Sequence, residues 1–371
     1  MTLLRNVLVR GYRSLRSVDL RLDRLNVLIG ANGAGKSNFI SLFKMLNEMM
    51  AGRLQQYIGS AGRSQSILYL GPKVTPQLEM TLEFELTDAV DTYYLRLFHA
   101  ANDTLVFADE TLAFRKRDWP EERIKPRSLG AGHQETMLRE PAKGDDPTSK
   151  VFRAVLNGCR LYHFHDTSAS APIRQYGYVG EDRWLKPDAG NLAAMLYAYR
   201  RTDRAAYDRI VSTIQKVMPE FQDFDLGPER LNANEIGLKW RRRGSDYLLG
   251  AHQLSDGSLR AMAMITLLLQ PEADLPKVLV LDEPELGLHP YALEIVAGLL
   301  RAASLRSQVI VATQSPTFLN HFAASEIIVV EPEADGSKFR RLDPKPLVDW
   351  LETYSTGELW EKNVLGGGPV A

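Results

Sequence analysis

The chain reads LNVLIGANGAGKSNFI over residues 25–40, and this stretch decides the fold. Residues 25–29 form a short, mostly apolar run, as expected of a buried strand, and a glycine-rich turn follows them. That turn matches the pattern G-x-x-x-x-G-K-S, and a helix is predicted directly after it, from Asn38 to about Met50. Because the pattern stands between a strand and a helix, it predicts a P-loop.

The predicted P-loop has the chemistry to bind nucleotide phosphates. Its glycines let backbone N–H groups converge on phosphate oxygens at a helix N-terminus, which favours anions. Lys36 is expected to reach the β- and γ-phosphates, and the hydroxyl of Ser37 is a ligand for Mg²⁺. A purely structural glycine turn would leave the Lys-Ser pair without a purpose. The residues expected to contact ATP are Gly30, Ala31, Asn32, Gly33, Ala34, Gly35, Lys36 and Ser37.

A second motif, VLVLDEPE at residues 278–285, places two adjacent carboxylates just past an apolar strand. At the carboxyl edge of a parallel sheet these side chains would lie near the P-loop. We expect Asp282 to hold the Mg²⁺ shell and Glu283 to polarise the attacking water. The alternative is a solvated turn after a strand, which is less favoured because the chain also contains a predicted P-loop. Together the two motifs predict ATP hydrolysis.

A third motif, LSDGS at residues 254–258, precedes the apolar helix pattern SLRAMAMITLLLQ. Alone it is an ordinary helix N-cap signal, with Ser255 or Asp256 as the capping residue. Its place shortly upstream of the Asp282 strand gives it a second interpretation, because a helix start can bind an anion separately from the P-loop. The candidate residues for this second anion site are Ser255 and Gly257.

Composition excludes several classes of protein. The 371 residues allow two or three structural units, and 44% hydrophobic with 25% charged residues is ordinary for a packed soluble protein. The 45 basic and 46 acidic residues give no overall basic field, so any contact with nucleic acid needs a local patch. The single Cys159 forms no internal disulfide, and no signal peptide or bilayer-length apolar run is visible. We expect a cytoplasmic protein without membrane contact.

The order of strand and helix patterns predicts an α/β protein with a mixed central sheet. Residues 78–114 alternate like an antiparallel meander, residues 115–150 are predicted to form a long surface loop, and residues 190–216 a small helical lobe. The expected parts are an N-terminal ATPase half with the antiparallel β subdomain at 1–150, an inserted helical lobe at 151–234, a C-terminal ATPase half at 235–345 and a tail at 346–371.

The chain resembles the ABC-type ATPases and, within them, the branch of RecF, SMC and OLD proteins. The resemblance rests on G-K-S-N ending at Asn38, on LSDGS with Ser255 and Gly257 matching the L-S-G-G-Q signature, on DEPELGLHP at 282–290 and on TQSP at 313–316. It covers about residues 1–50 and 235–330. No heptads stand between the P-loop and the signature, so the architecture is closer to RecF or to defence ATPases without a coiled coil.

This resemblance implies a P-loop NTPase of the ABC-ATPase head type that binds ATP and Mg²⁺, with Asn38 in the site. It also implies a homodimer that closes around two ATP molecules, in which Ser255 and Gly257 of one copy complete the site of the other. The catalytic switch position after the last core strand, usually His, is Gln314 here. Glutamine can hydrogen-bond the γ-phosphate or the attacking water but carries no proton, so slow turnover is expected.

The position of the Q-loop glutamine and the role of a histidine-rich run each have two possible interpretations. The Q-loop glutamine of the class could be Gln65 or Gln77, and either could be an ordinary surface residue. His163, His165 and Asp166 follow the alternation of a strand and could bind a metal, although no further His or Cys stands at ligand spacing nearby.

The leading hypothesis is an ATP-driven switch that acts on DNA, in repair or in defence against foreign DNA. Because no nuclease motif is visible and the branch commonly pairs such an ATPase with another protein, a separately encoded effector such as a nuclease is expected. Basic segments at 115–127, at 241–243 and on the helical lobe are candidate DNA contacts, and each could be a solvated surface. The rival is the nucleotide-binding subunit of a membrane transporter, which usually carries L-S-G-G-Q and S-x-L-D where this chain has LSDGS and ELGLHP.

Overall fold

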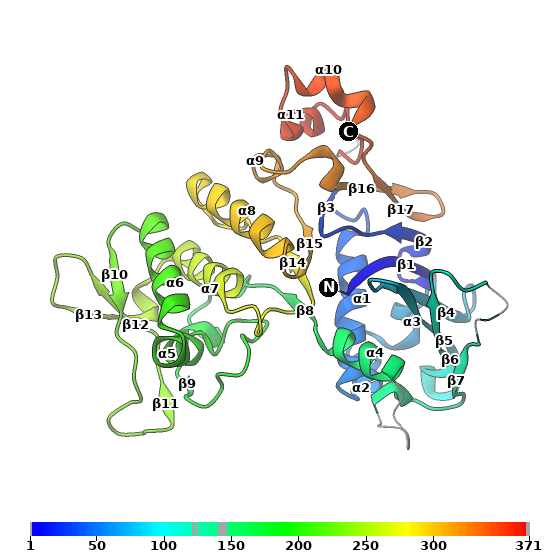
Figure 1. The fold of residues 1–371 in the computed structure, drawn as a ribbon, viewed down its shortest axis with the longest axis horizontal. Helices are drawn as coiled ribbons and strands as arrows, with labels where there is room; N and C mark the ends of the chain where they lie inside the picture. Colours follow the sequence, from blue (N-terminus) through cyan, green and yellow to red (C-terminus); the bar gives the residue numbers. More distant parts are fainter. Residues whose placement is uncertain (1, 121–122, 124, 140–146, 369–371) are drawn as a thin grey trace.

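A six-stranded sheet forms the centre of the computed structural model, which describes residues 2–120, 123, 125–139 and 147–368 (Figure 1). Its strands, in spatial order, are β17 (Gly336–Arg341), β16 (Ile327–Glu333), β3 (Leu25–Ile29), β15 (Gln308–Ala312), β14 (Val278–Asp282) and β8 (Cys159–Tyr162). All pairs are parallel except β16 with β17. The predicted mixed α/β sheet is therefore confirmed.

Apolar clusters cover both faces of the central sheet. Along β14 and β15, Leu281 and Val311 belong to one cluster, and Val280 and Ile310 belong to the other. Successive side chains of a strand point to opposite faces, which is why strands buried on both sides are apolar throughout. Helix α1 (Lys36–Met50) contributes to the second cluster, and α7 (Asp256–Leu269) and α8 (Pro290–Ser304) contribute to the first.

A second, largely antiparallel sheet packs with α1 on the side opposite α7 and α8 (Figure 1, right). Its order is β2 (Leu15–Arg21), β1 (Leu3–Tyr12), β4 (Gln77–Glu85), β5 (Ala89–Ala100), β6 (Thr104–Lys116) and β7 (Arg127–Gly130). The short helices α2 (Leu54–Ser60) and α3 (Arg63–Ile67) pack beside it. The meander predicted at 78–114 is confirmed by β4, β5 and β6, whose buried and half-buried residues alternate.

The long loop predicted at 115–150 is wrong for the described part of that range. Strand β6 continues to Lys116, β7 follows, and α4 (Pro147–Asn157) begins before the range ends. Helix α4 buries Phe152 and Leu156 in the second cluster, and the Phe152 ring meets that of Phe84 edge-on at 5.6 Å. The Pro and Gly content of the range suggested a loop, and four-residue β7 is too short to give a clear periodicity. The spacing of Phe152, Val155 and Leu156 does follow the period of a helix and could have identified α4. Residues 121, 122, 124 and 140–146 lie outside the described part.

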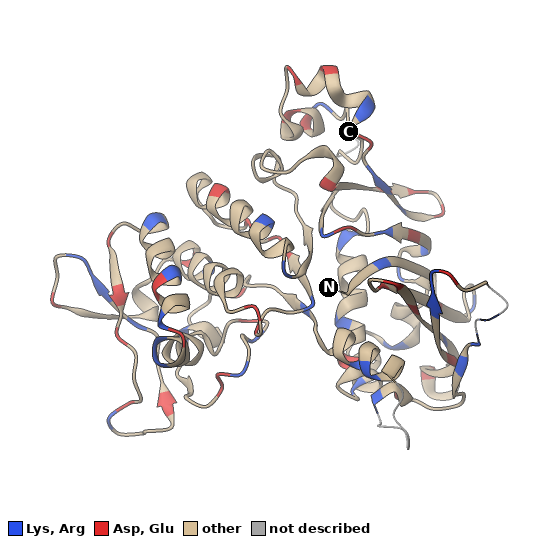
Figure 2. Ribbon diagram, in the orientation of Figure 1, with Lys and Arg blue, Asp and Glu red and all other residues tan. Residues whose placement is uncertain are grey.

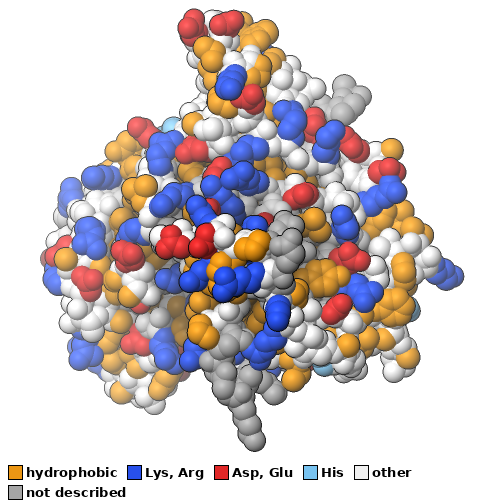
Figure 3. Space-filling view, turned by 45° about the vertical axis from the view of Figure 1, so that its right-hand side comes forward, with side chains coloured by type: hydrophobic (Ala, Val, Ile, Leu, Met, Phe, Trp, Pro, Cys, Tyr) orange, Lys and Arg blue, Asp and Glu red, His pale blue; other side chains and the backbone are white. Residues whose placement is uncertain are grey.

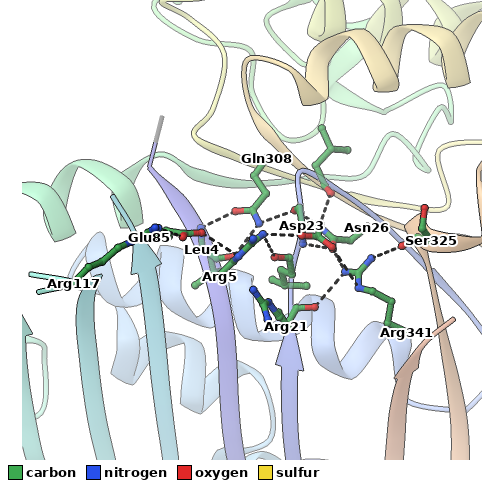
Figure 4. A network of polar contacts seen from close by, with 12 residues as sticks. Leu4, Arg5, Arg21, Asp23, Asn26, Glu85, Arg117, Gln308, Ser325 and Arg341 are labelled. Atoms are coloured by element: carbon green, nitrogen blue, oxygen red, sulfur yellow. Dashed lines mark hydrogen bonds and ion pairs between the residues drawn. The ribbon is translucent and has the colours of Figure 1, made fainter. Parts of the chain in front are cut away.

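A buried polar network joins the two sheets at the amino ends of the central strands, away from the P-loop (Figure 4). Gln308 is fully buried, accepts a hydrogen bond from Leu4 N at 2.9 Å and donates to Leu4 O at 2.8 Å, as a neighbouring strand would. Arg5 bonds Asp23 at 2.7 Å and lies 3.0 Å from a carboxylate oxygen of Glu85. These contacts hold the antiparallel sheet against the central sheet through buried Gln308 and half-buried ion pairs.

The helical lobe forms the left side of Figure 1. It holds α5 (Leu192–Thr202), α6 (Arg204–Val217), the sheet of β10 (Phe221–Phe224), β12 (Lys239–Arg242) and β13 (Leu248–Gly250), and the pair of β9 (Gly177–Tyr178) and β11 (Glu235–Ile236). The helices predicted at 190–216 are confirmed, and the basic segment at 241–243 lies at the hairpin of β12 and β13.

The expected part boundaries do not follow the edges of these sheets. Strand β8 falls within 151–234 yet is the edge strand of the central sheet, and β12 falls within 235–345 yet pairs with β10 of the lobe. Beyond the central sheet, α9 (Pro316–Leu319), α10 (Val348–Leu351) and α11 (Thr356–Glu361) form a small group at the C-terminal end of the described chain (Figure 1, top). None of the helices in the described ranges has both the length and the apolar character needed to cross a bilayer.

Candidate functional site

The P-loop connects β3 to α1, and its lysine lies inside the loop. Lys36 is 5% exposed and donates from Nζ to the carbonyl oxygens of Gly30 at 2.6 Å and Ala31 at 3.1 Å. Gly35 has a φ of +117°, and a Cβ there would strike the Ser337 side chain. A Cβ on Gly30 would lie 2.3 Å from the carbonyl oxygen of Val330. The two glycines are therefore required by conformation and by close packing, and the lysine occupies the loop that phosphates would fill.

The outer side of the loop is open to solvent. Asn32, Gly33 and Ser37 are exposed, so backbone N–H groups and the Ser37 hydroxyl can meet a ligand. Asn38 instead donates from Nδ2 to the Ser14 hydroxyl at 2.7 Å, which ties α1 to the turn between β1 and β2. Ala34 is buried. The predicted residues 30–38 thus form one continuous strand–turn–helix unit with an anion-accepting helix start.

The carboxylates after β14 lie at the same sheet edge as the P-loop, because β14, β15 and β3 are adjacent and parallel. Burial, followed by the charge of Glu283, raises the pKa of Asp282, while His165 and Lys36 oppose that rise. Burial lowers the pKa of Lys36, which Glu283, Asp282 and Glu285 oppose. This mutual influence places the lysine and the three carboxylates in one electrostatic site.

The backbone at Glu283 is in an uncommon conformation. Its φ is +45°, and its N–H donates to the carbonyl oxygen of Ala312 at 2.8 Å. The Gln314 amide, from the segment after β15, donates to Oε1 of Glu283. A non-glycine residue in the left-handed region stores strain that surrounding contacts must hold, and such residues cluster at functional sites. The structure brings together Glu283 and Gln314, the predicted water-activating and switch residues.

A carboxylate that the sequence analysis overlooked lies beside this pair. Oε1 of Glu285 accepts hydrogen bonds from the Thr313 hydroxyl at 2.5 Å and from Gln314 N at 3.1 Å. Burial raises the pKa of Glu285. The second glutamate in DEPE is the signal that could have identified it. Glu285 holds the backbone of the switch segment and so orients Gln314.

The segment after β8 also reaches the site, which the sequence did not predict. Nε2 of His165 lies 3.0 Å from the carbonyl oxygen of Asp282. By contrast, Gln65 lies in α3, and Gln77 opens β4, where it donates to Glu79 at 2.6 Å. Within the described ranges no group of three or more His, Cys, Asp or Glu side chains could hold a metal by itself.

Magnesium fits the residues at this edge without such a group. The ion usually keeps several waters and binds one or two carboxylates together with substrate phosphates. Asp282 and the exposed Ser37 hydroxyl are oxygen donors of that kind at the sheet edge. The donor set is therefore suited to Mg²⁺ carried by a nucleotide.

The LSDGS motif forms the start of α7. Ser255 is the exposed N-cap, and its hydroxyl accepts from Ser258 N at 3.1 Å. A Cβ on Gly257 would lie 2.4 Å from the carbonyl oxygen of Gly287, in the turn after the Asp282 carboxylates. Figure 1 shows α7 beside the lobe and α1 on the other side of the central sheet. The helices that follow the P-loop and the LSDGS motif therefore pack on opposite faces of the central sheet.

Comparison with known proteins agrees with this geometry. The chain is similar to the crystal structure of the SmcHead bound to the C-winged helix domain of ScpA, at 16% identity with a TM-score of 0.58, covering 93% of this chain and 99% of that one. It is also similar to the Smc head domain with an extended coiled coil bound to the C-terminal domain of ScpA from Pyrococcus furiosus, at 15% identity with a TM-score of 0.59. That match covers 95% of this chain and 99% of that one.

A third similar structure is the Smc head domain with a coiled coil and joint from Pyrococcus yayanosii, at 14% identity with a TM-score of 0.55, covering 95% and 99% of the two chains. No curated protein sequence matches the chain. Residues 25–320 match the family described as "AAA domain, putative AbiEii toxin, Type IV TA system". The matched range contains the P-loop, both carboxylates, the signature and Gln314, and the chain belongs to this AAA family as a P-loop ATPase with an SMC-like head fold.

Proposed function

We propose that this ATPase is a switch that closes as a homodimer around two ATP molecules and acts on DNA. The observation that carries the proposal is the presence of two anion-accepting surfaces on one chain. Ser255 is exposed at the start of α7, which packs on the face of the central sheet opposite α1, and one nucleotide needs only one P-loop.

Hydrolysis follows from the residues at the sheet edge. Lys36 would release the Gly30 carbonyl and bind the β- and γ-phosphate oxygens, while Ser37 and Asp282 would hold Mg²⁺, which when bound neutralises phosphate charge. Glu283 orients the attacking water and accepts its proton. Gln314, held by Glu285, keeps the Glu283 carboxylate in place and can hydrogen-bond the γ-phosphate.

Closure depends on the γ-phosphate. In a twofold pair, Ser255 and the first N–H groups of α7 from one copy would face the γ-phosphate held by Lys36 of the other. ADP lacks that phosphate and would not hold the two copies together. Dimerisation then reports bound ATP.

Local basic surfaces support an action on DNA. Arg242 and Arg243 are exposed at the β12–β13 hairpin, where Figure 2 shows basic residues. Trp119 lies under Arg123 at 4.3 Å and near Lys116 at 5.9 Å, an aromatic and basic combination suited to nucleic acid. The face in Figure 3 carries several groups of Lys and Arg side chains interrupted by acidic ones.

A separately encoded effector is part of the proposal, and a nuclease is the favoured class. The family description names a toxin–antitoxin system, and two of the similar Smc heads carry ScpA domains in their crystals, so a head of this fold can bind another protein. A role in defence or in DNA repair follows from this pairing. The cytoplasm is the proposed location.

The test compares ATP hydrolysis with and without duplex DNA and measures oligomeric state by light scattering. Glu283→Gln protein with saturating ATP and Mg²⁺ should be dimeric, and the same protein with ADP should be monomeric. Stimulation by DNA favours the DNA switch over a transporter subunit, which has no reason to respond to DNA. A monomer with ATP would exclude the closed dimer.

A mixing experiment tests completion in trans. Ser255→Arg blocks the signature and Lys36→Ala removes the P-loop cation, so each homodimer should be inactive. A heterodimer retains one intact site, made by the P-loop of the Ser255→Arg copy and the signature of the Lys36→Ala copy. Hydrolysis should return in the mixture. If the mixture contains demonstrated heterodimers and stays inactive, one composite site made from two copies is not enough for hydrolysis, which contradicts this prediction.

A further inference from the structure

Arg174 donates hydrogen bonds to residues on both sides of Ser255 in the LSDGS signature. Its side chain is 10% exposed, although its guanidinium is charged. Nη1 donates to the carbonyl oxygens of Ala251 at 2.6 Å and Leu254 at 3.1 Å, and Nη2 donates to Oδ1 of Asp256 at 2.7 Å. One side chain therefore holds the backbone before Ser255 and the carboxylate after it.

Asp256 is the position at which LSDGS departs from the L-S-G-G-Q pattern. The hydrogen bond from Arg174 lowers the pKa of its carboxyl, as does the hydroxyl of Thr167 to a smaller extent. A carboxylate in the first turn of α7 would repel a phosphate if it faced the same way as Ser255. The bond to Arg174 offsets that charge and fixes where the carboxylate points.

The same arginine connects the signature to the Asp282 edge of its own chain. Nε of Arg174 donates to the carbonyl oxygen of Thr167 at 2.7 Å. Arg260, in α7, donates from Nη2 to the carbonyl oxygen of His165 at 2.8 Å and to the Thr167 hydroxyl at 3.2 Å. His165 in turn contacts the carbonyl oxygen of Asp282 at 3.0 Å. Both arginines thus donate hydrogen bonds to Thr167, which lies two residues after His165, the residue that contacts Asp282.

We propose that Arg174 is a positioning residue that presents the signature of its own chain to the ATP of the partner copy. This inference rests on the proposed closed dimer. The four hydrogen bonds of Arg174 go to Thr167, Ala251, Leu254 and Asp256, not to the P-loop of its own chain, so we expect it to leave nucleotide binding there unchanged. Removing it should let the segment 251–256 move and let the Asp256 carboxylate face the phosphate.

The first test uses the homodimer. Arg174→Met should lower kcat for ATP about tenfold or more and leave the Kd for ATP of the monomer within about twofold, because only the closed state is affected. Arg174→Lys keeps the charge but not the fork of donors, so it should recover only part of the rate. Arg301→Met is the matched control, since Arg301 also donates to a backbone carbonyl, that of His321 at 2.6 Å, but from α8 and away from the signature. Its kcat should be unchanged.

The asymmetric heterodimer separates positioning from a general loss of stability. Arg174→Met is added either to the Lys36→Ala copy, whose signature is used, or to the Ser255→Arg copy, whose P-loop is used. We expect loss of activity of about tenfold only in the first arrangement. Equal loss in both arrangements would show a structural role of the lobe, and no loss in either would overturn the proposal.

The failure of the proposed function gives a different pattern. If the unmodified Lys36→Ala and Ser255→Arg pair is inactive, completion in trans fails before Arg174 is tested. In that case Arg174→Met in the otherwise unaltered protein decides: wild-type kcat excludes the positioning role, and a lower kcat with unchanged melting temperature assigns it to the same chain's site, which also overturns the proposal as stated.

Discussion

The amide of Gln314 donates a hydrogen bond to Oε1 of Glu283, so the switch segment after β15 holds the carboxylate at the end of β14. The carboxylate sits on a backbone with φ of +45°, and Gln314 is itself held by Glu285. The position of the Glu283 carboxylate therefore depends on the amide side chain of Gln314, which cannot exchange a proton.

Gln314→Ala should lower kcat about tenfold, the effect expected when a hydrogen bond to a charged group is removed. The Kd for ATP should stay within about twofold, because Lys36 and the P-loop are unchanged. Steady-state hydrolysis and equilibrium nucleotide titration measure the two quantities. Gln314→Glu is the charge control: it keeps the size but replaces the donor with a like charge beside Glu283. A wild-type kcat for Gln314→Ala would show that Gln314 is not needed for hydrolysis.

Lys36→Ala and Glu283→Gln should fail at different steps. Loss of the only P-loop cation should weaken ATP binding about 100-fold, since hydrogen bonds from charged donors are the strong ones. Glu283→Gln should bind ATP normally and lower hydrolysis about 100-fold or more, the range of general-base catalysis. Fluorescent nucleotide binding and single-turnover hydrolysis separate the two. Hydrolysis by Glu283→Gln at the wild-type rate would assign the base elsewhere.

Gly257→Ala tests the packing of the signature against the turn after β14. The added Cβ would lie 2.4 Å from the carbonyl oxygen of Gly287, so the start of α7 or that turn must shift. We expect slower hydrolysis with unchanged ATP binding to the monomer. Gly298→Ala in α8 is the matched control, because no atom lies within 4 Å of its Cβ position. Equal activity of the two variants would show that the contact is not required.

Removal of Arg241, Arg242 and Arg243 together should weaken binding of duplex DNA equally for different sequences. Phosphate contacts carry charge but no base information, and each lost contact should flatten the plot of log Kd against log salt by about 0.9. Arg241 is paired with Asp225, so Arg242 and Arg243 should carry most of the effect. Fluorescence anisotropy at several salt concentrations gives the slope. An unchanged slope would direct the search to the 115–127 segment.

The buried carboxyl group of Asp91 should make the free energy of unfolding depend on pH. Asp91 is 1% exposed in β5, its Oδ1 has no hydrogen-bond partner, and burial raises its pKa to about 6. The folded state therefore holds the proton to higher pH than the unfolded chain, so stability falls as pH rises from about 4 to about 6 and stays lower above that. Asp91→Asn should stabilise the protein by about 1–2 kcal/mol at pH 7.5 and by much less at pH 4. Urea unfolding at both pH values measures the difference, and an equal effect at both would contradict it.

Local patterns were enough to predict the elements that carry the nucleotide chemistry. The P-loop, the Asp282 strand and the α7 start each combine a short apolar run with a turn or cap whose residues have few other uses. Glu285 was missed, and His165 was considered only as a metal ligand, because their roles depend on contacts with residues far away in the chain, Thr313 and Asp282. Strand β7 was missed because four residues carry no measurable period. The strand expected around His163, His165 and Asp166 is β8, which ends at Tyr162, before these residues.

Arg174 shows the same limit for an interaction between segments. Nothing around it in the sequence marks it, since its four hydrogen bonds go to backbone and side-chain atoms at 167 and 251–256. The departure at Asp256 was visible, but the cation that accompanies it could be found only in three dimensions.

The chain leaves the central sheet after β8 and re-enters it at β14, the next strand in spatial order, so residues 163–277 form a single excursion from one edge. An excursion of this kind can change in length without altering strand order, because the entropy cost of closing a loop grows only slowly with its length. The Smc head with an extended coiled coil has a similar fold, and the match covers 99% of that chain. We therefore expect that a heterologous domain inserted in the lobe would leave the strand order of the central sheet unchanged.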